Sequence, residues 1–240
     1  MGLDLRYESA EVHRGVLQAD GGVFIPSTTI SLPTKEDGTI VVNTEGSIEL
    51  SDDNGSAWRP DGHSGRFSRL DWSALYEQRL EDALLTFGLI SYSLPNGSEF
   101  AFGERGGTTE FLVEAMTEVG GVSPSLSANY DFDEAKGLYL QAAVGKDVEL
   151  REGLQLGLEV SLGWMDEDQA FWQMAQDPPA SGLADLRLTA ELAYALDAHT
   201  SALLEVGYSE MVDDDFKTWM NFIGIDPRQG WVGAAVRWSY

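Results

Sequence analysis

Three glutamates recur at every fourth position within one stretch of the chain: Glu110, Glu114 and Glu118. Side chains of an extended strand alternate between two faces, so residues an even number of positions apart share a face. At about 3.3 Å per residue, successive members of this row lie about 13 Å apart. A row of carboxylates attracts cations and repels anions, as acidic rings do in cation channels. Such a row needs a long strand with a polar face to hold it.

The stretch Leu154–Trp164 has the clearest strand pattern of this kind. Every second residue from Leu154 onward is apolar, and the residues between them are polar or glycine. Residues 186–196 and 232–240 repeat the alternation. A period of two that is kept over this length predicts a β-strand with one apolar and one polar face.

Twelve segments of this kind can be traced, and most approach the roughly 9–11 residues that a tilted strand needs to cross a bilayer. Connections after even-numbered segments are short, whereas those after odd-numbered segments are often long. Short turns at one rim and long loops at the other are typical of outer-membrane barrels, which have an even number of strands. The sequence therefore predicts an all-β fold over residues 1–240, a single-domain transmembrane antiparallel up-and-down β-barrel with 12 strands. The expected segments are 3–16, 23–33, 39–51, 67–80, 83–95, 108–119, 122–132, 138–149, 154–165, 183–196, 200–211 and 230–240.

Aromatic residues of the apolar parity fall near the two expected rims, where amphipathic rings favour the membrane interfaces. The chain also ends on an aromatic residue, Tyr240. We interpret this end as the signal by which barrel-insertion machinery recognises its clients. The short-turn group is Tyr194, Trp238 and Tyr240, and the long-loop group is Trp72, Tyr130, Phe132, Trp164 and Tyr208.

The overall composition narrows the classes of protein. The 240 residues include 15 Lys and Arg against 40 Asp and Glu, a formal net charge of −25, which makes nucleic acid a poor partner. The absence of cysteine excludes disulfide scaffolds and thiolate zinc sites. The sequence contains no run of about 18 apolar residues, so it predicts no membrane-spanning helix. We expect an exported barrel to be made with a leader, so a chain that opens Met1-Gly2-Leu3 is interpreted as a mature form. A soluble acidic β-barrel is an alternative.

Assigning the polar parity to the inside of the barrel gives an acidic lumen, with twelve acids against four bases. We expect a narrow lumen that passes or binds small cationic or neutral solutes. The alternative is a closed structural or interaction barrel, in which arginines each clamp two or more carboxylates. The acids are Glu45, Glu49, Asp71, Glu77, Glu110, Glu114, Glu118, Asp131, Glu159, Asp185, Glu191 and Glu205, and the bases are Arg6, Arg79, Arg187 and Arg237.

The expected long loops carry acid clusters and one of the three histidines. The clusters Asp52-Asp53-Asn54-Gly55, Asp166-Glu167-Asp168 and Asp213-Asp214-Asp215 could hold Ca²⁺, but they lack the EF-hand spacing, and a solvated acidic rim is the other interpretation. His13, His63 and His199 are scattered, without a nucleophile elbow, HExxH motif or P-loop beside them. We predict no enzyme, no catalytic residue, no metal site and no cofactor; a barrel enzyme is the least favoured alternative.

Short motifs along the chain are similar to those of a known family. His13–Gln18 resembles an Arg-Gly segment of the TorF-like porin family, which comprises bacterial outer-membrane barrels, and Leu70–Tyr76 through Ser91–Asn96 resembles its central hairpin. Thr109–Phe111 and Gly137–Leu140 resemble later strands, so the likeness covers nearly the whole chain. It implies a 12-stranded barrel in the outer membrane that supports passive diffusion, although the acidity here exceeds what the family requires. We expect a monomer whose partners are outer-membrane lipid, small solutes and the insertion machinery.

Overall fold

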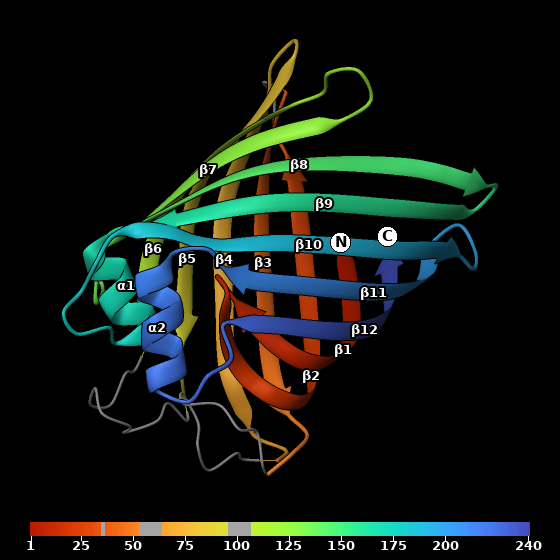
Figure 1. Ribbon diagram of the computed structural model, residues 1–240. Coiled ribbons are helices and arrows are strands. Elements are labelled where there is room, and N and C mark those ends of the chain that lie inside the picture. Colours follow the sequence, from red (N-terminus) through yellow and green to blue (C-terminus); the bar gives the residue numbers. More distant parts are fainter. Residues whose placement is uncertain (35–36, 53–63, 96–106) are drawn as a thin grey trace.

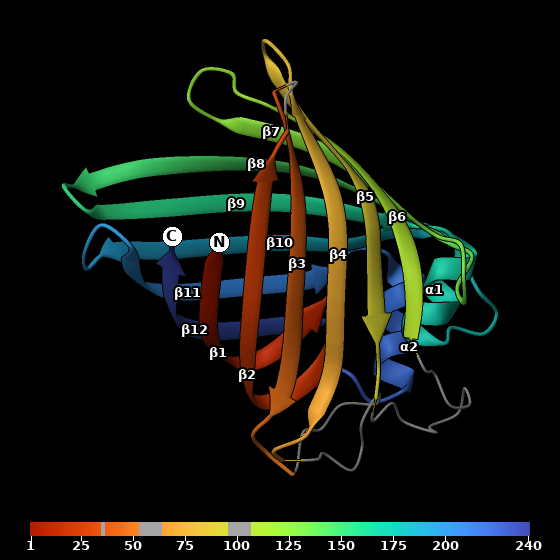
Figure 2. The same ribbon diagram turned by 180° about the vertical axis from the view of Figure 1, so that it is seen from behind.

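The computed structural model describes residues 1–34, 37–52, 64–95 and 107–240. Twelve antiparallel strands close into one barrel, in which each strand pairs with its neighbours in sequence and β1 pairs with β12 (Figures 1 and 2). The predicted all-β barrel is confirmed. Its strands are β1 (Gly2–His13), β2 (Val16–Pro33), β3 (Gly38–Glu49), β4 (Phe67–Arg79), β5 (Ala83–Ser93), β6 (Gly107–Thr117), β7 (Ser123–Asp131), β8 (Leu138–Arg151), β9 (Leu154–Met165), β10 (Gly182–Ala195), β11 (Thr200–Met211) and β12 (Arg228–Ser239).

The strands carry their apolar side chains on the outside of the barrel. In β9, Leu158, Val160 and Leu162 are exposed, whereas Ser161 between them is buried. This arrangement inverts that of a water-soluble protein, because the outward face of a membrane barrel contacts acyl chains.

The two rims differ as the loop lengths predict. Both termini lie at the short-turn rim, and Met1 and Tyr240 are joined there by backbone hydrogen bonds. The opposite rim bears two short helices that were expected as loops, α1 (Glu167–Met174) and α2 (Asp214–Phe222). No helix of the described residues is long and apolar enough to cross a bilayer.

The first two strands depart from the predicted segments 3–16 and 23–33. Only a two-residue turn, Arg14-Gly15, separates β1 from β2, so β2 begins at Val16. Pairing of β1 with β12 stops at Glu8↔Gly233, and pairing of β2 with β3 reaches no further than Val23↔Glu49. The intervening hairpin, residues 9–22, therefore leaves the wall while its two strands stay paired with each other. Figure 1 shows the red ends of β1 and β2 turning toward the helices.

The hairpin folds inward because its alternating pattern fails. After Glu8, both parities carry polar residues, and no continuous apolar face is left to contact lipid. Its apolar residues instead pack against both helices and the inner wall, as the main buried cluster of the molecule. We call residues 9–22 together with α1 and α2 the plug. The cluster contains Ala10, Val12, Val16 and Leu17 of the hairpin, Ala170, Met174, Phe216 and Met220 of the helices, Ile225 of the loop after α2, and Tyr139, Met165, Ala184, Met211 and Trp231 of the wall.

Candidate functional site

The tip of the inward hairpin is a tight turn at Arg14 and Gly15. Both residues have positive φ, 48° and 76°, which is the geometry of a two-residue turn that matches the twist of the flanking strands. A side chain at Gly15 would also meet Asp185, since a Cβ there would lie 2.7 Å from the Cβ of Asp185. Glycine is therefore required at this position, and the turn brings Arg14 against the far wall.

Arg14 forms a buried two-point contact with Glu110 of β6. Its Nη1 and Nη2 atoms donate to the two carboxylate oxygens over 2.6 and 2.5 Å. The hydroxyl of Tyr92 also donates to Glu110, and the Arg14 guanidinium lies 4.5 Å from the ring centre of Tyr139. Glu110 is 1% exposed, so two opposite charges have been removed from water, and each depends on the other. The contact ties the hairpin tip to strands beyond its own neighbours in the wall.

Arg69 of β4 collects the next group of carboxylates. It lies 3.0 Å from Glu11 of the hairpin, 3.5 Å from Glu45 and 2.8 Å from Asp71. The hydroxyl of Ser47 donates to the same Glu11 carboxylate over 3.0 Å. A cavity of about 20 Å³ beside Arg69 and Glu110 has room for about one water. Arg14 and Arg69 thus pair with carboxylates in the filled long-loop half, where Asp131 and Asp185 accept hydrogen bonds from the hydroxyls of Thr108 and Tyr139.

The base of the hairpin and the adjoining wall hold a third group of ion pairs. Arg6 lies within 4 Å of Asp4, Glu8 and Glu205. Arg237 contacts Asp4 at 3.1 Å and Glu191 at 3.9 Å. On the other side of Glu205, the indole N–H of Trp231 donates to its carboxylate, and the Arg187 guanidinium lies 4.7 Å from the Trp231 ring.

Three glutamates toward the short turns differ from these groups, because they lack such partners. Glu77 of β4, Glu114 of β6 and Glu159 of β9 form no ion pair with any described residue. Glu114 experiences like-charge repulsion from Glu77 and Glu159. Glu77 and Glu114 both lie opposite Thr86 of β5, so they flank it on the same wall, and Glu159 lies three strands beyond β6. Glu77 and Glu114 are partly exposed and Glu159 is exposed, so all three carboxylates contact solvent.

The predicted lumen residues fall into three groups in the structure. Glu49, Glu110, Asp131 and Asp185 are buried in the long-loop half. Glu45, Asp71, Arg187, Glu191, Glu205 and Arg237 belong to the ion-paired and Trp231 groups described above. Glu77, Arg79, Glu114 and Glu159 lie toward the short turns, and Glu118 lies one residue beyond the end of β6.

Sequence reasoning missed several residues of the interior. Arg69 has the parity of Asp71 in the same segment, so the alternation could have found it. Arg14 and Glu11 had only one signal, the loss of alternation after Glu8, because their positions depend on the hairpin leaving the wall.

Two of the acid clusters act as helix caps. A carboxylate oxygen of Asp166 accepts from the Gln169 N–H at the start of α1, and Asp213 accepts from the Asp215 N–H at the start of α2. The acids that follow each cap lie in the first helical turn, where negative charge is favoured by the helix dipole. Of the third cluster, Asp53-Asn54-Gly55 lies outside the described residues, as does His63.

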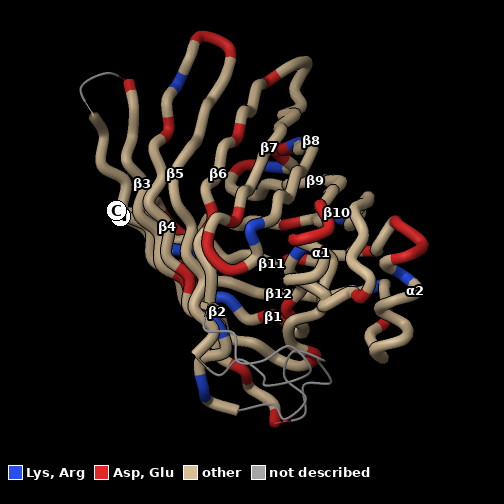
Figure 3. The backbone as a smooth tube through the Cα atoms, turned by 90° about the vertical axis from the view of Figure 1, so that its left-hand side faces the viewer, with Lys and Arg blue, Asp and Glu red and all other residues tan. Residues whose placement is uncertain are grey.

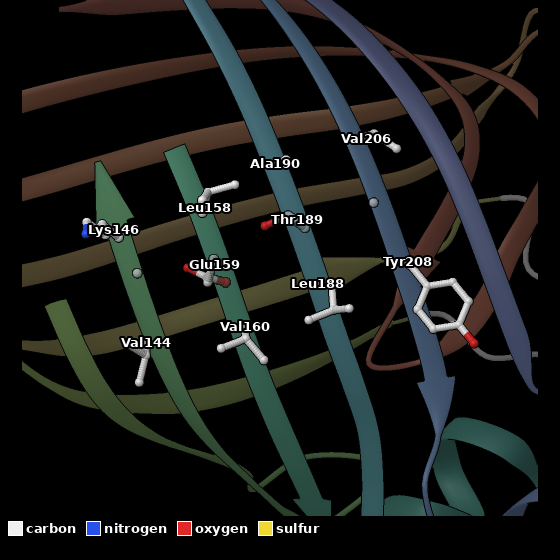
Figure 4. Close-up of a pocket in the computed structure, with 12 residues that line it drawn as sticks. Val144, Lys146, Leu158, Glu159, Val160, Leu188, Thr189, Ala190, Val206 and Tyr208 are labelled. Carbon is white, nitrogen blue, oxygen red and sulfur yellow. The ribbon is translucent and has the colours of Figure 1, made fainter. Parts of the chain in front are cut away.

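The outer wall has a shallow apolar depression of about 450 Å³ across β8 to β11. Val144, Val160, Leu188 and Tyr208 line it from four neighbouring strands (Figure 4). All four side chains are exposed, as contact with acyl chains requires. Most of the aromatic residues predicted for the two rims are exposed as well: Trp72, Tyr130, Phe132, Tyr194, Tyr208 and Tyr240.

Comparison with solved structures supports the class of fold. The chain is similar to the KdgM porin, with 13% identity, a TM-score of 0.56 and coverage of 100% of this chain and 99% of that chain. It is also similar to the COG4313 outer membrane channel from Pseudomonas putida F1, with 10% identity, a TM-score of 0.59 and coverage of 100% and 94%. The NanC porin is 10% identical, with a TM-score of 0.57 and coverage of 99% of this chain and 100% of that chain. No protein-family model and no curated protein sequence matches the chain.

These likenesses define a porin-like outer-membrane barrel fold. The resemblance to the TorF-like porins in particular stays a prediction.

Proposed function

We propose that this protein is a monomeric outer-membrane channel, related to the TorF-like porins, that passes small cationic or neutral solutes. In this proposal it is inserted by the barrel-assembly machinery and surrounded by outer-membrane lipid. The long-loop half is constricted by the plug, and the short-turn half is an acidic entrance.

The observation that carries the proposal is the set of three glutamates without ion-pair partners, Glu77, Glu114 and Glu159. Glu77 and Glu114 flank Thr86 of β5 on one wall, Glu159 lies on β9, and all three carboxylates contact solvent. Carboxylates in this position raise the local concentration of cations and lower that of anions. Figure 3 shows acidic positions outnumbering basic ones along the chain, which adds to the same field.

The second candidate is a closed barrel with a structural or binding role, and the plug favours it. The long-loop half is packed with buried side chains and paired charges. A channel with this plug must conduct through a narrow path or must move the plug. Conductance therefore discriminates between the two candidates.

The test is the current through the purified protein in planar lipid bilayers under a salt gradient. We expect cation-preferring conductance, and we expect the triple variant Glu77→Gln, Glu114→Gln and Glu159→Gln to lower the permeability ratio of cation to anion several-fold. The matched control removes the same charge from the exposed long-loop rim, as Glu134→Gln, Asp168→Asn and Asp214→Asn, and should change the ratio much less. Absence of current, or a preference for anions, would contradict the proposal.

A further inference from the structure

Part of one edge of β12, Arg228–Val232, has no strand beside it among the described residues. β12 begins at Arg228, yet its pairing with β1 starts only at Gly233. Among the described residues, no strand covers Arg228–Val232 on the β1 side. The Val232 N–H donates to the Ser9 hydroxyl over 3.0 Å, and the Arg228 N–H donates to the Asp226 carboxylate over 2.9 Å. Unpaired strand edges in natural proteins are covered or blocked, so we expect a segment of the chain to cover this edge.

Residues 9–13 of β1, which are not paired with β12, are long enough to pair with the whole of this edge. Pairing advances one residue for one from Gly2↔Ser239 to Glu8↔Gly233. Continued without a bulge, the same register places Ser9 opposite Val232, Glu11 opposite Gly230 and His13 opposite Arg228. The last strand residue of β1 would then meet the first strand residue of β12.

The polarity of the hairpin is compatible with this second position. On β12, the outward Val232 is exposed and apolar, whereas the next outward residues toward the long-loop rim are Gly230 and Arg228. Glu11 and His13 would therefore face outward at the level of Gly230 and Arg228, beyond the last apolar outward residue of β12, where charge is tolerated.

The bends that turn the hairpin inward are local. The register between β1 and β2 shifts twice, between Glu8 and Ala10 and between Glu11 and Val12. Gly21 and Gly22 lie opposite the first shift, and glycines give the backbone freedom to bend there. Beyond these bends, the charged contacts that hold the hairpin inside are Arg14 with Glu110 and Glu11 with Arg69.

We propose that residues 9–22 form a movable gate, held shut by the Arg14–Glu110 pair, and that its open position is the vacant edge of β12. This inference rests on the proposed channel function. Opening would withdraw the hairpin from the long-loop half and complete the wall with the same strand.

Cysteine pairs can measure the two positions, because the chain has no cysteine of its own. Glu11→Cys with Ser47→Cys reports the closed position, in which these side chains are hydrogen-bonded. Glu11→Cys with Gly230→Cys reports the open position, because directly opposed antiparallel residues have Cα atoms about 4.5–5.5 Å apart, within the range of a disulfide. A Cβ at Gly230 meets only the Gly207 carbonyl oxygen, at 3.8 Å, so a cysteine fits there.

We expect the closed pair to cross-link most in the otherwise unchanged protein, and Arg14→Gln to raise the 11–230 cross-link several-fold in lipid vesicles. The matched control, Arg151→Gln, removes an exposed arginine at the short-turn end of β8 and should not change it. Heat-dependent gel mobility checks that each variant forms the barrel.

In planar bilayers, the 11–230 disulfide should raise conductance and the 11–47 disulfide should lower it, and reduction should reverse both effects. If no 11–230 cross-link forms in either background, or if it forms and leaves the current unchanged, the gate is wrong while a conducting protein still supports the channel. If no variant conducts in any state, the proposed function itself fails.

Discussion

Two positions on the same face of β6 show how differently the interior of the barrel treats charge. Glu110 and Glu114 lie four residues apart on one face of β6. Glu110 is buried and held by Arg14, whereas Glu114 is partly exposed and has no ion-pair partner among the described residues. The difference comes from the hairpin, which carries Arg14 into the long-loop half and does not reach the short-turn half.

This contrast shows that a count of charges along a strand face gives the wrong field. Parity alone assigns twelve acids and four bases to the lumen, but it omits Arg14, which pairs with Glu110, and Arg69, which contacts Glu11, Glu45 and Asp71. The attraction between a guanidinium and the carboxylates it contacts is stronger in the protein interior than in water. Parity therefore does not distinguish the carboxylates that have an arginine partner from Glu77, Glu114 and Glu159, which have none among the described residues.

The largest expected effect concerns the apolar part of the plug. Phe216 of α2 is 0% exposed, whereas Phe222 at the end of the same helix is 78% exposed. We expect Phe216→Ala to lower the free energy of unfolding by about 3–5 kcal/mol, because it leaves a cavity among packed side chains. Phe222→Ala should change it by less than about 0.5 kcal/mol. Urea unfolding in detergent micelles, followed by tryptophan fluorescence, measures both, and equal losses would contradict a packed plug.

The barrel itself could be predicted from the sequence because lipid imposes a simple rule on every strand. The outward face must be apolar, so the period of two persists through stretches such as Leu154–Trp164. Loop lengths then separated the two rims. The predicted strand boundaries mostly agree with the structure to within a few residues, and the clear exceptions are β1 and β2.

The plug could not be predicted in the same way. Residues 9–22 leave the wall, so neither their parity nor their neighbours in sequence determine what they contact. Arg14 meets Glu110, which is 96 residues away in the sequence, and only the closed barrel brings the two together. The helices were missed because α1 and α2 are short, with acidic first turns that also fit a solvated loop.

A matched pair of substitutions on β6 tests the contrast directly. Glu110→Gln removes the carboxylate that neutralises buried Arg14, and loss of one partner from a buried ion pair should lower the free energy of unfolding by about 3 kcal/mol. Glu114→Gln should change stability by less than about 0.5 kcal/mol but should lower cation preference. The free energy of unfolding and the reversal potential, each measured on both variants, test these two expectations. The contrast fails if Glu114→Gln destabilises as much as Glu110→Gln.

The smallest expected effect is the response to salt. Raising the salt concentration from 0.1 to 1 M shortens the Debye length from about 10 Å to about 3 Å. Glu77, Glu114 and Glu159 contact solvent, so their attraction for cations should be screened and the cation-to-anion permeability ratio should fall. The Arg14–Glu110 pair is buried, so the stability difference between the unchanged protein and Glu110→Gln should stay nearly constant over the same range. Reversal potentials and urea midpoints at both salt concentrations measure the two responses. A stability difference that collapses in 1 M salt would mean that water and ions reach Arg14, and that the long-loop half is as accessible as the short-turn half.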